Sequence, residues 1–344
     1  MHSGGLEYDG ARPTVTIGID VGGTNIRAAV VDGEGVIVDA ASAPTPRSAE
    51  SLAAAIVGVV HELAGPESVR EDGTVDSLAG NYSIGAVGLA VAGFVNRERT
   101  IVRYAPHLPW LDAPVARDLS AVLGLPVVLE HDANAAAVAE YRYGAAAGGR
   151  NVVVIALGTG IGGAFVQEGN LYRGSFGVAP ELGHIQVVPE GRSCACGKRG
   201  CWERYCSGTA LVDTAIEHLA KSPRQFTTLS REVATDPAGL TGRRVAGAAQ
   251  AGDALALAVM ADFSQWLGVG ISLVADVFDP DLIVISGGVA QSAPLFLDAA
   301  REHYQRLATG AGYRSMPRIR STQLGESAGL IGAAELARIS LSST

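Results

Sequence analysis

Short apolar runs alternate along the chain with longer amphipathic segments, and glycine or polar residues close most of them. The apolar runs predict strands over 14–19, 26–31, 84–92, 126–130, 152–157, 164–167 and 282–286. Helical spacing predicts helices over 51–64, from 132 to about 143, and over 325–339. The polar, glycine-containing stretch 66–82 is predicted to be a surface loop.

One strand–turn–strand pattern occurs twice, at a spacing of 136 residues (22 to 158). The positions that coincide are Gly22 with Gly158, Asp32 with Glu168, and Gly33 with Gly169. Such a repeat predicts two related domains that face each other, with a glycine-rich hairpin from each lining the cleft. The alternative is a chance similarity between two β-hairpins.

The length of 344 residues also suggests two domains, and 48% hydrophobic with 18% charged residues fits a compact globular protein.

A net charge of −9 without a long Lys/Arg run makes nucleic acids and acidic membranes poor candidate partners. The longest apolar stretch, 266–275, stops at Asp276 and is too short to span a bilayer. Residues 1–13 lack the apolar core of a signal peptide and are expected to be a disordered tail.

Three glycine-containing turns follow predicted strands and could approach an anion closely through their backbone N–H groups. Asp20, at the end of the first strand, can hold Mg²⁺ directly or through water because a hard cation prefers oxygen ligands. Any one turn alone is weak evidence, but the three together indicate a nucleotide site. The candidate nucleotide-binding residues are Asp20, Gly22, Gly23, Thr24, Gly158, Thr159, Gly160, Gly162, Gly287 and Gly288.

The four cysteines lie within thirteen residues, at 194, 196, 201 and 206. This clustering indicates metal binding in a reducing, cytoplasmic compartment rather than a spread of disulfides. Three thiolates and an imidazole would complete a tetrahedral zinc site, and His184 lies ten residues upstream of Cys194. From spacing alone, Cys206 could instead be the fourth ligand.

The run from Asp20 to Thr24 resembles the first phosphate motif of the actin, hexokinase and heat-shock ATPase superfamily. From about residue 14 to 340 the chain resembles the ROK branch of that superfamily, and within it the bacterial glucokinases. The resemblance implies an α/β protein of two actin-like ATPase (ribonuclease H-like) domains, each on a mixed five-stranded sheet, closing on sugar and ATP. We place these domains at 14–131 with 322–344, and at 132–321, with the zinc knot at 184–201.

The resemblance also implies roles for particular residues. Asp132 matches the general base, and Cys206 becomes a small core residue because the family pattern selects His184 as the fourth zinc ligand. The implied sugar contacts are Gly93, His131, Asp132, Glu181, His184 and Glu203, and the implied zinc ligands are His184, Cys194, Cys196 and Cys201. Two histidines depart from the family pattern, which usually has asparagine at the positions of His131 and His107.

The implied function is phosphorylation of glucose at O6 with ATP, Mg²⁺ and one structural Zn²⁺, in a homodimer or homotetramer. An N-acetylmannosamine or N-acetylglucosamine kinase shares every motif, and fructose, mannose, allose or a polyphosphate donor are further alternatives. Sugar-responsive repressors of the same family carry an additional DNA-binding domain before the phosphate motif. We expect an enzyme, because few residues precede the first strand.

Overall fold

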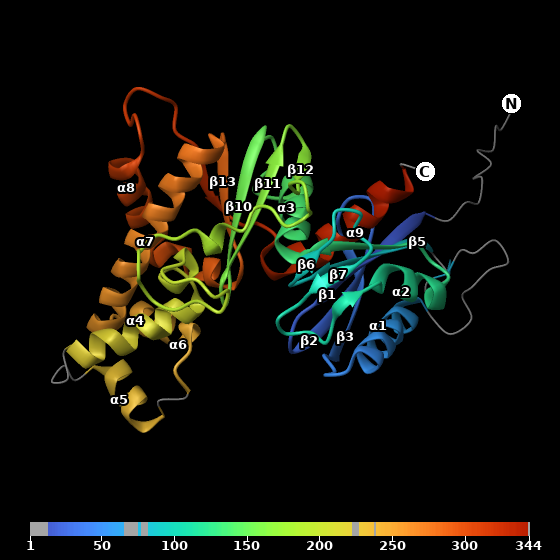
Figure 1. Ribbon diagram of the computed structural model, residues 1–344, viewed down its shortest axis with the longest axis horizontal. Coiled ribbons are helices and arrows are strands. Elements are labelled where there is room, and N and C mark those ends of the chain that lie inside the picture. The colour runs from blue at the N-terminus through green and yellow to red at the C-terminus, as the bar shows by residue number, and fades with distance from the viewer. Residues whose placement is uncertain (1–12, 65–74, 77–81, 222–226, 237–238, 343–344) are drawn as a thin grey trace, which may run out of the picture. The chain divides into compact units, whose positions relative to one another are not determined.

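The computed structural model describes residues 13–64, 75–76, 82–221, 227–236 and 239–342 (Figure 1). The chain divides into two compact units, 1–135 with 329–344 (unit 1) and 136–328 (unit 2). The boundaries expected from the sequence fall a few residues earlier at both crossings. The expected tail up to residue 12, and most of the expected loop 66–82, lie outside the described residues.

Unit 1 contains a mixed sheet in the order β3-β2-β1-β5, with β4 and β9 both paired to β5. Strand β1 is antiparallel to β2 and parallel to β5, and β5 is parallel to β9. A second, three-stranded sheet has the order β6-β7-β8. The bounds are β1 (Thr14–Val21), β2 (Asn25–Val31), β3 (Ile37–Pro44), β4 (Val75–Asp76), β5 (Ser83–Val91), β6 (Phe94–Val95), β7 (Val102–Tyr104), β8 (Leu111–Ala113) and β9 (Val127–His131).

Helices cover both faces of the main sheet of unit 1. The bounds are α1 (Ala49–Ala64), α2 (Val115–Leu123), α9 (Ala328–Leu341) and α3 (Asp132–Tyr143), which begins in unit 1 and ends in unit 2. Alternate residues of β1, such as Ile17 and Ile19, share a core with the buried side of α1. On the opposite face, a Cβ at Gly18 or Gly88 would lie less than 2 Å from a carbonyl oxygen of α9. These glycines therefore let α9 pack directly on β1 and β5.

Unit 2 repeats the topology of unit 1. Its sheet has the order β12-β11-β10-β13-β14, with each neighbouring pair running in the same relative direction as in β3-β2-β1-β5-β9. The repeat found in the sequence is thus a repeat of structure, and the predicted α/β class with mixed sheets is confirmed. The bounds are β10 (Asn151–Leu157), β11 (Ile161–Gln167), β12 (Asn170–Tyr172), β13 (Leu282–Ser286) and β14 (Arg318–Ser321).

The helices of unit 2 pack around the 25-residue helix α7. By length and composition α7 could cross a membrane, although the uninterrupted apolar stretch within it, 266–275, is too short to span a bilayer. Moreover, 56% of its most apolar stretch is buried in the core of unit 2, which is typical of a core helix. The bounds are α4 (Gly208–Lys221), α5 (Thr228–Thr235), α6 (Gly242–Gln250), α7 (Ala254–Phe278), α8 (Leu297–Leu307), and the 3₁₀ helices η1 (Leu182–His184), η2 (Trp202–Arg204), η4 (Gly288–Leu295) and η5 (Gly325–Ser327).

Candidate functional site

The first glycine turn joins the two central strands β1 and β2 of unit 1. The Gly22 N–H donates to the Asn25 carbonyl at 3.0 Å, which closes the turn, and Thr45 Oγ1 donates to the Gly22 carbonyl at 2.7 Å. A Cβ at Gly23 would lie 2.9 Å from the Cβ of His107, so the loop that contains this departure from the family pattern packs on the turn. The turn is therefore held in place and has no room for a side chain on that side.

Asp20 lies one residue before the end of β1, and its carboxylate is mostly buried. Arg27 lies opposite it on β2 and donates from Nη2 to Asp20 Oδ2 at 2.5 Å. Burial raises the pKa of Asp20, whereas the hydrogen bond and charge of Arg27 act in the opposite direction, and the Asp132 carboxylate adds to the rise. Arg27 did not appear among the predicted site residues, because only the strand register places it beside Asp20.

Asp132 is the first residue of α3 and directly follows β9. Its Oδ1 accepts from the Ala133 N–H at 2.7 Å and lies 3.3 Å from Nε2 of His131. Its Oδ2 has no hydrogen-bond donor among the residues that the structure describes. Glu130 precedes this pair in the chain. It is buried and accepts from the His131 N–H at 3.1 Å and from Asn134 Nδ2 at 2.9 Å. The Asp132 carboxylate is thus oriented through one oxygen, while the other can accept a proton.

The remaining predicted residue of unit 1 is Gly93, between β5 and β6. A Cβ there would lie 2.7 Å from the Tyr104 carbonyl oxygen and 2.8 Å from the Ala105 Cβ. The backbone at this position consequently passes close to the segment that leads to His107. Glycine is required for the approach, and any ligand contact at this position must involve the backbone.

The second glycine turn lies between β10 and β11 of unit 2. Its backbone is joined to the start of α4, because the Gly208 N–H donates to the Gly158 carbonyl at 2.8 Å and Thr209 Oγ1 to the Thr159 carbonyl at 2.9 Å. A Cβ at Gly160 would lie 2.5 Å from Oε2 of Glu203. This turn therefore brings a predicted nucleotide-binding backbone next to a predicted sugar-binding carboxylate.

Gly287 and Gly288 follow β13 and open the 3₁₀ helix η4. Gly287 has a φ of +85°, and a Cβ there would lie 2.5 Å from the carbonyl oxygen of Leu157 at the end of β10. Both the backbone conformation and the close approach require glycine. The third predicted turn is thereby fixed beside the second one.

Two short 3₁₀ helices place a carboxylate on each side of the His184 ring. Nε2 of His184 lies 3.8 Å from Oε2 of Glu181, and its Nδ1 lies 3.6 Å from Oε1 of Glu203. Glu203 is the more enclosed of the two, with 18% of its side chain exposed against 37% for Glu181. The three residues form one polar cluster with hydrogen-bonding groups for neighbouring hydroxyls.

The structure brings together the four residues that were expected to bind zinc. The ligand atoms of His184, Cys194, Cys196 and Cys201 all lie within 4.8 Å of one another. Cys194 Sγ is 3.7 Å from His184 Nδ1, and the Sγ atoms of Cys196 and Cys201 are 3.6 Å apart. A tetrahedron built on bonds of about 2.3 Å has edges of about 3.7 Å. These residues therefore fit a tetrahedral Zn²⁺ ion.

The cysteines of the knot have pKa values shifted in different directions. Burial raises the pKa of Cys194 and Cys201, so forming their thiolates requires a positive partner. At Cys196, hydrogen bonds from the Lys198 N–H and the neighbouring thiols outweigh burial and lower the pKa.

Cys206 is fully buried and its Sγ lies 3.8 Å from the Phe263 carbonyl oxygen, within the core of unit 2. The structure places His184, and not Cys206, beside the other three cysteines.

The knot is anchored by residues that the sequence did not single out. Lys198 Nζ donates to the His184 carbonyl at 2.6 Å. Trp202 is fully buried, donates from Nε1 to the Trp266 carbonyl at 2.8 Å, and lies where a Cβ at Gly270 of α7 would clash with its ring. Because Trp202 immediately precedes Glu203, the core of unit 2 anchors the backbone on one side of that residue.

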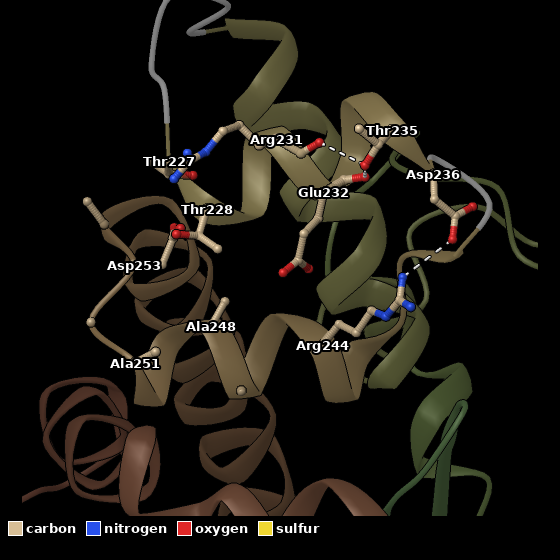
Figure 2. Close-up of a pocket in the computed structure, with 13 residues that line it drawn as sticks. Thr227, Thr228, Arg231, Glu232, Thr235, Asp236, Arg244, Ala248, Ala251 and Asp253 are labelled. Carbon is tan, nitrogen blue, oxygen red and sulfur yellow. Dashed lines mark hydrogen bonds and ion pairs between the residues drawn. The ribbon is translucent and has the colours of Figure 1, made fainter.

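A separate cavity of about 890 Å³ lies in unit 2 between α5, α6 and the start of α7 (Figure 2). Its lining includes Arg231, Glu232 and Asp253, and an ion pair of 3.5 Å joins Arg244 to Asp236. No predicted site residue lines this cavity. The candidate site is therefore defined by the glycine turns and the polar clusters, not by this opening.

Comparison with known proteins identifies the family. The model of the ROK family matches residues 16–339, which is most of the chain. This chain belongs to the ROK family. Among ROK relatives, the glucokinase of Streptomyces coelicolor is 41% identical over 324 residues, covering 94% of this chain and 98% of the relative.

Solved ROK structures agree with this assignment. A ROK family glucokinase from Streptomyces griseus, in complex with glucose and AMPPNP, superposes with a TM-score of 0.80 at 38% identity, covering 94% of this chain and 99% of the other. The ROK hexokinase from Thermus thermophilus gives a TM-score of 0.76 at 31% identity, covering 96% of this chain and all of the other. The similarity to these structures therefore covers both units of this protein.

We expect the wild-type protein to contain one zinc ion per chain. Cys196→Ser should lose most of it, because a serine hydroxyl is a poor replacement for a thiolate ligand. Cys206→Ser is the matched control and should keep its zinc, since Cys206 lies outside the cluster. Metal analysis of the purified proteins would check this. Zinc lost from Cys206→Ser but kept in His184→Ala would point to a four-cysteine site instead.

Proposed function

We propose that this chain is a glucokinase that transfers the terminal phosphoryl group of ATP to O6 of glucose, with Mg²⁺. The observation that carries the proposal is the 41% identity to the S. coelicolor glucokinase over 94% of the chain. The structure of the related S. griseus glucokinase contains glucose and the nucleotide AMPPNP, which supports a sugar and a nucleotide as the two substrates. The residues described above supply the groups that such a reaction requires.

Asp132 is proposed as the general base. As the sugar 6-hydroxyl oxygen attacks the terminal phosphorus, its proton passes to the carboxylate and the bond to the leaving ADP oxygen breaks. Asp132 is at the start of α3, and the Ala133 N–H and His131 hold its Oδ1 in place. The exposed fraction of the Asp132 side chain, 43%, leaves Oδ2 accessible to a substrate.

The polar cluster of Glu181, His184 and Glu203 is proposed to bind sugar hydroxyls. Glu181 and Glu203 can each accept from two neighbouring hydroxyls, because a carboxylate has two oxygens. His184 would use Nδ1 for zinc, so that Nε2 remains for a hydroxyl on the side of Glu181. Gly93 contributes its backbone, and His131 offers one hydrogen bond beside the base.

The phosphates are assigned to the three glycine turns. The turns at Gly22 to Thr24, at Gly158 to Gly162, and at Gly287 with Gly288 would donate to phosphate oxygens through backbone N–H groups other than those of Gly22 and Gly158, which donate within their own turns. Asp20 would hold Mg²⁺, which neutralises charge on the transferring phosphoryl group. Positioning and charge stabilisation supply most of the acceleration in phosphoryl transfer, so the rigid packing of these turns is part of the proposed mechanism.

Zinc is proposed as structural. Four protein ligands close its coordination shell, so no position remains for a substrate. Its role would be to fix the ring of His184 and, through Cys201, the chain that carries Glu203. We further propose a cytoplasmic homodimer or homotetramer that acts on small molecules, without nucleic acid or membrane partners.

A panel of sugars with ATP or polyphosphate tests the proposed substrate pair. We expect glucose with MgATP to give the highest kcat/KM, and N-acetylmannosamine and N-acetylglucosamine to be much poorer. Fructose, mannose and allose complete the panel. A higher kcat/KM for an acetylated hexosamine would overturn the choice of sugar and leave the kinase reaction in place.

Asp132→Asn keeps the shape of the side chain but removes the proton acceptor. The expected result is a fall in kcat of roughly 10²-fold or more with a small change in glucose affinity, because general-base catalysis typically contributes 10²–10⁴-fold. Steady-state kinetics and glucose titration would measure the two effects separately. If a tenth of the wild-type kcat remained, another group would have to be the base.

The zinc-deficient Cys196→Ser variant tests the link between the metal and the sugar. Its KM for glucose should rise far more than its KM for ATP, since His184 and Glu203 lose their fixed positions. Cys206→Ser should leave both KM values near those of the wild type. Equal increases in the two KM values would argue that zinc stabilises unit 2 as a whole.

A further inference from the structure

Two cysteines of the zinc knot have sulfur atoms close to each other and differ in their access to solvent. Cys196 is exposed and lies in a loop that the bridge between Ser193 and Arg199 closes. Cys201 follows this loop and is buried. Their Sγ atoms are 3.6 Å apart. At this separation, small rotations of the two side chains bring the sulfur atoms to bonding distance.

We propose that Cys196 and Cys201 form an oxidation site, at which a hydroperoxide converts the two thiolates into a disulfide and the metal is released. The disulfide depends only on the positions and the exposure of the two cysteines. Its consequence for sugar binding rests on the proposed function, because it requires His184 and Glu203 to bind the sugar.

The reaction needs one two-electron oxidant, such as hydrogen peroxide. The thiolate of Cys196 attacks one peroxide oxygen, which forms a sulfenic acid and releases hydroxide. The thiolate of Cys201 then attacks the sulfenic sulfur, so that the S–S bond forms and a second hydroxide leaves. Two thiolates have then lost two electrons, and the peroxide has gained them. Since only a thiolate is a good zinc ligand, two of the four ligands are lost together.

The surroundings of the cysteines favour this pair. A Cβ at the neighbouring Gly197 would meet no atom within 4 Å, so the loop is open beside Cys196 and an oxidant in solution can reach its sulfur. Cys194 is buried instead, and its Sγ lies 3.0 Å from Oε1 of Glu203. This third sulfur therefore faces a carboxylate and not the solvent. Cys201 is the partner within reach that the oxidised Cys196 is expected to meet.

The polar cluster would feel the loss of these ligands in two ways. His184 shares the proposed metal with both cysteines, and Glu203 follows Cys201 by two residues. We therefore expect oxidation to weaken the binding of glucose more than the binding of ATP. Disulfides in a reducing compartment are ordinarily transient, so a dithiol together with Zn²⁺ should reverse the change.

Treatment of the zinc-loaded wild-type protein with hydrogen peroxide tests the inference without an activity assay. A chelating dye should detect release of one zinc ion per chain, and the intact mass should fall by that of two hydrogen atoms. Peptide mapping without reduction should place the disulfide between Cys196 and Cys201. Dithiothreitol with Zn²⁺ should restore both the mass and the zinc content. Cys206→Ser is the matched control and should release zinc at the wild-type rate, since Cys206 is fully buried outside the cluster.

Three results would each overturn the proposal: a disulfide that involves Cys194 or Cys206, sulfinic acid without a disulfide, or retention of zinc with unmodified cysteines. Steady-state kinetics of the oxidised protein then measures the consequence. The KM for glucose should rise by about 10-fold or more, with a much smaller change in the KM for ATP. An unchanged KM for glucose would refute the link to the sugar. A wild type that forms the disulfide but phosphorylates no glucose would refute the kinase assignment and leave the oxidation site intact.

Discussion

The close approach of backbone to side chains at the glycine turns is the constraint on which both units depend. In unit 1, the turn at Gly23 packs against His107. In unit 2, the turn at Gly160 packs against the Glu203 carboxylate, and Gly287 packs against the end of β10. A Cβ at any of these positions would lie less than 3 Å from another atom, so a side chain there would force a neighbour to shift. Glycine therefore allows this close packing and leaves the backbone of the turns exposed to a ligand, as the proposed recognition of phosphate by backbone N–H groups requires.

The zinc knot would hold the polar cluster of His184 and its neighbouring carboxylates in place against the core of unit 2. Carboxylates and an imidazole must be held within a few ångströms of each other, although loops are ordinarily mobile. Zinc ligation by His184 and Cys201, together with the buried Trp202, would fix a short segment that has little regular secondary structure. The Gly160 contact then ties Glu203 to the second glycine turn. In unit 2, a residue proposed to bind the sugar therefore lies directly against a turn proposed to bind phosphate.

Many strands, the repeated sheet and most of the candidate zinc ligands could be predicted from the sequence, because each depends on a local pattern of residues. The strand at 282–286 was predicted with its observed bounds, and the repeat of the first hairpin predicted the shared sheet topology. The cysteine spacing alone left the fourth zinc ligand open, since ten residues separate His184 from Cys194 and spacing does not fix a fold. Arg27 could not be identified, because a charged residue on a strand is ordinary until the register shows its partner. The full length of α7 was hidden by the polar residues that interrupt its apolar run.

The net charge of −9 would by itself oppose binding of a nucleotide. The charges close to the first glycine turn matter more than this total. Salt largely screens charges that lie further from the ligand than the Debye length, which is about 8 Å at physiological ionic strength. At the first turn the relevant groups are nearer: Arg27 beside Asp20, the start of α9, and the backbone N–H groups of Gly23 and Thr24. The carboxylates of Asp20 and Asp132 would repel phosphate, and Arg27 offsets only one of these two charges. The proposed Mg²⁺ would offset the other, so the proposed metal follows from the placement of two acidic groups and not from the overall charge.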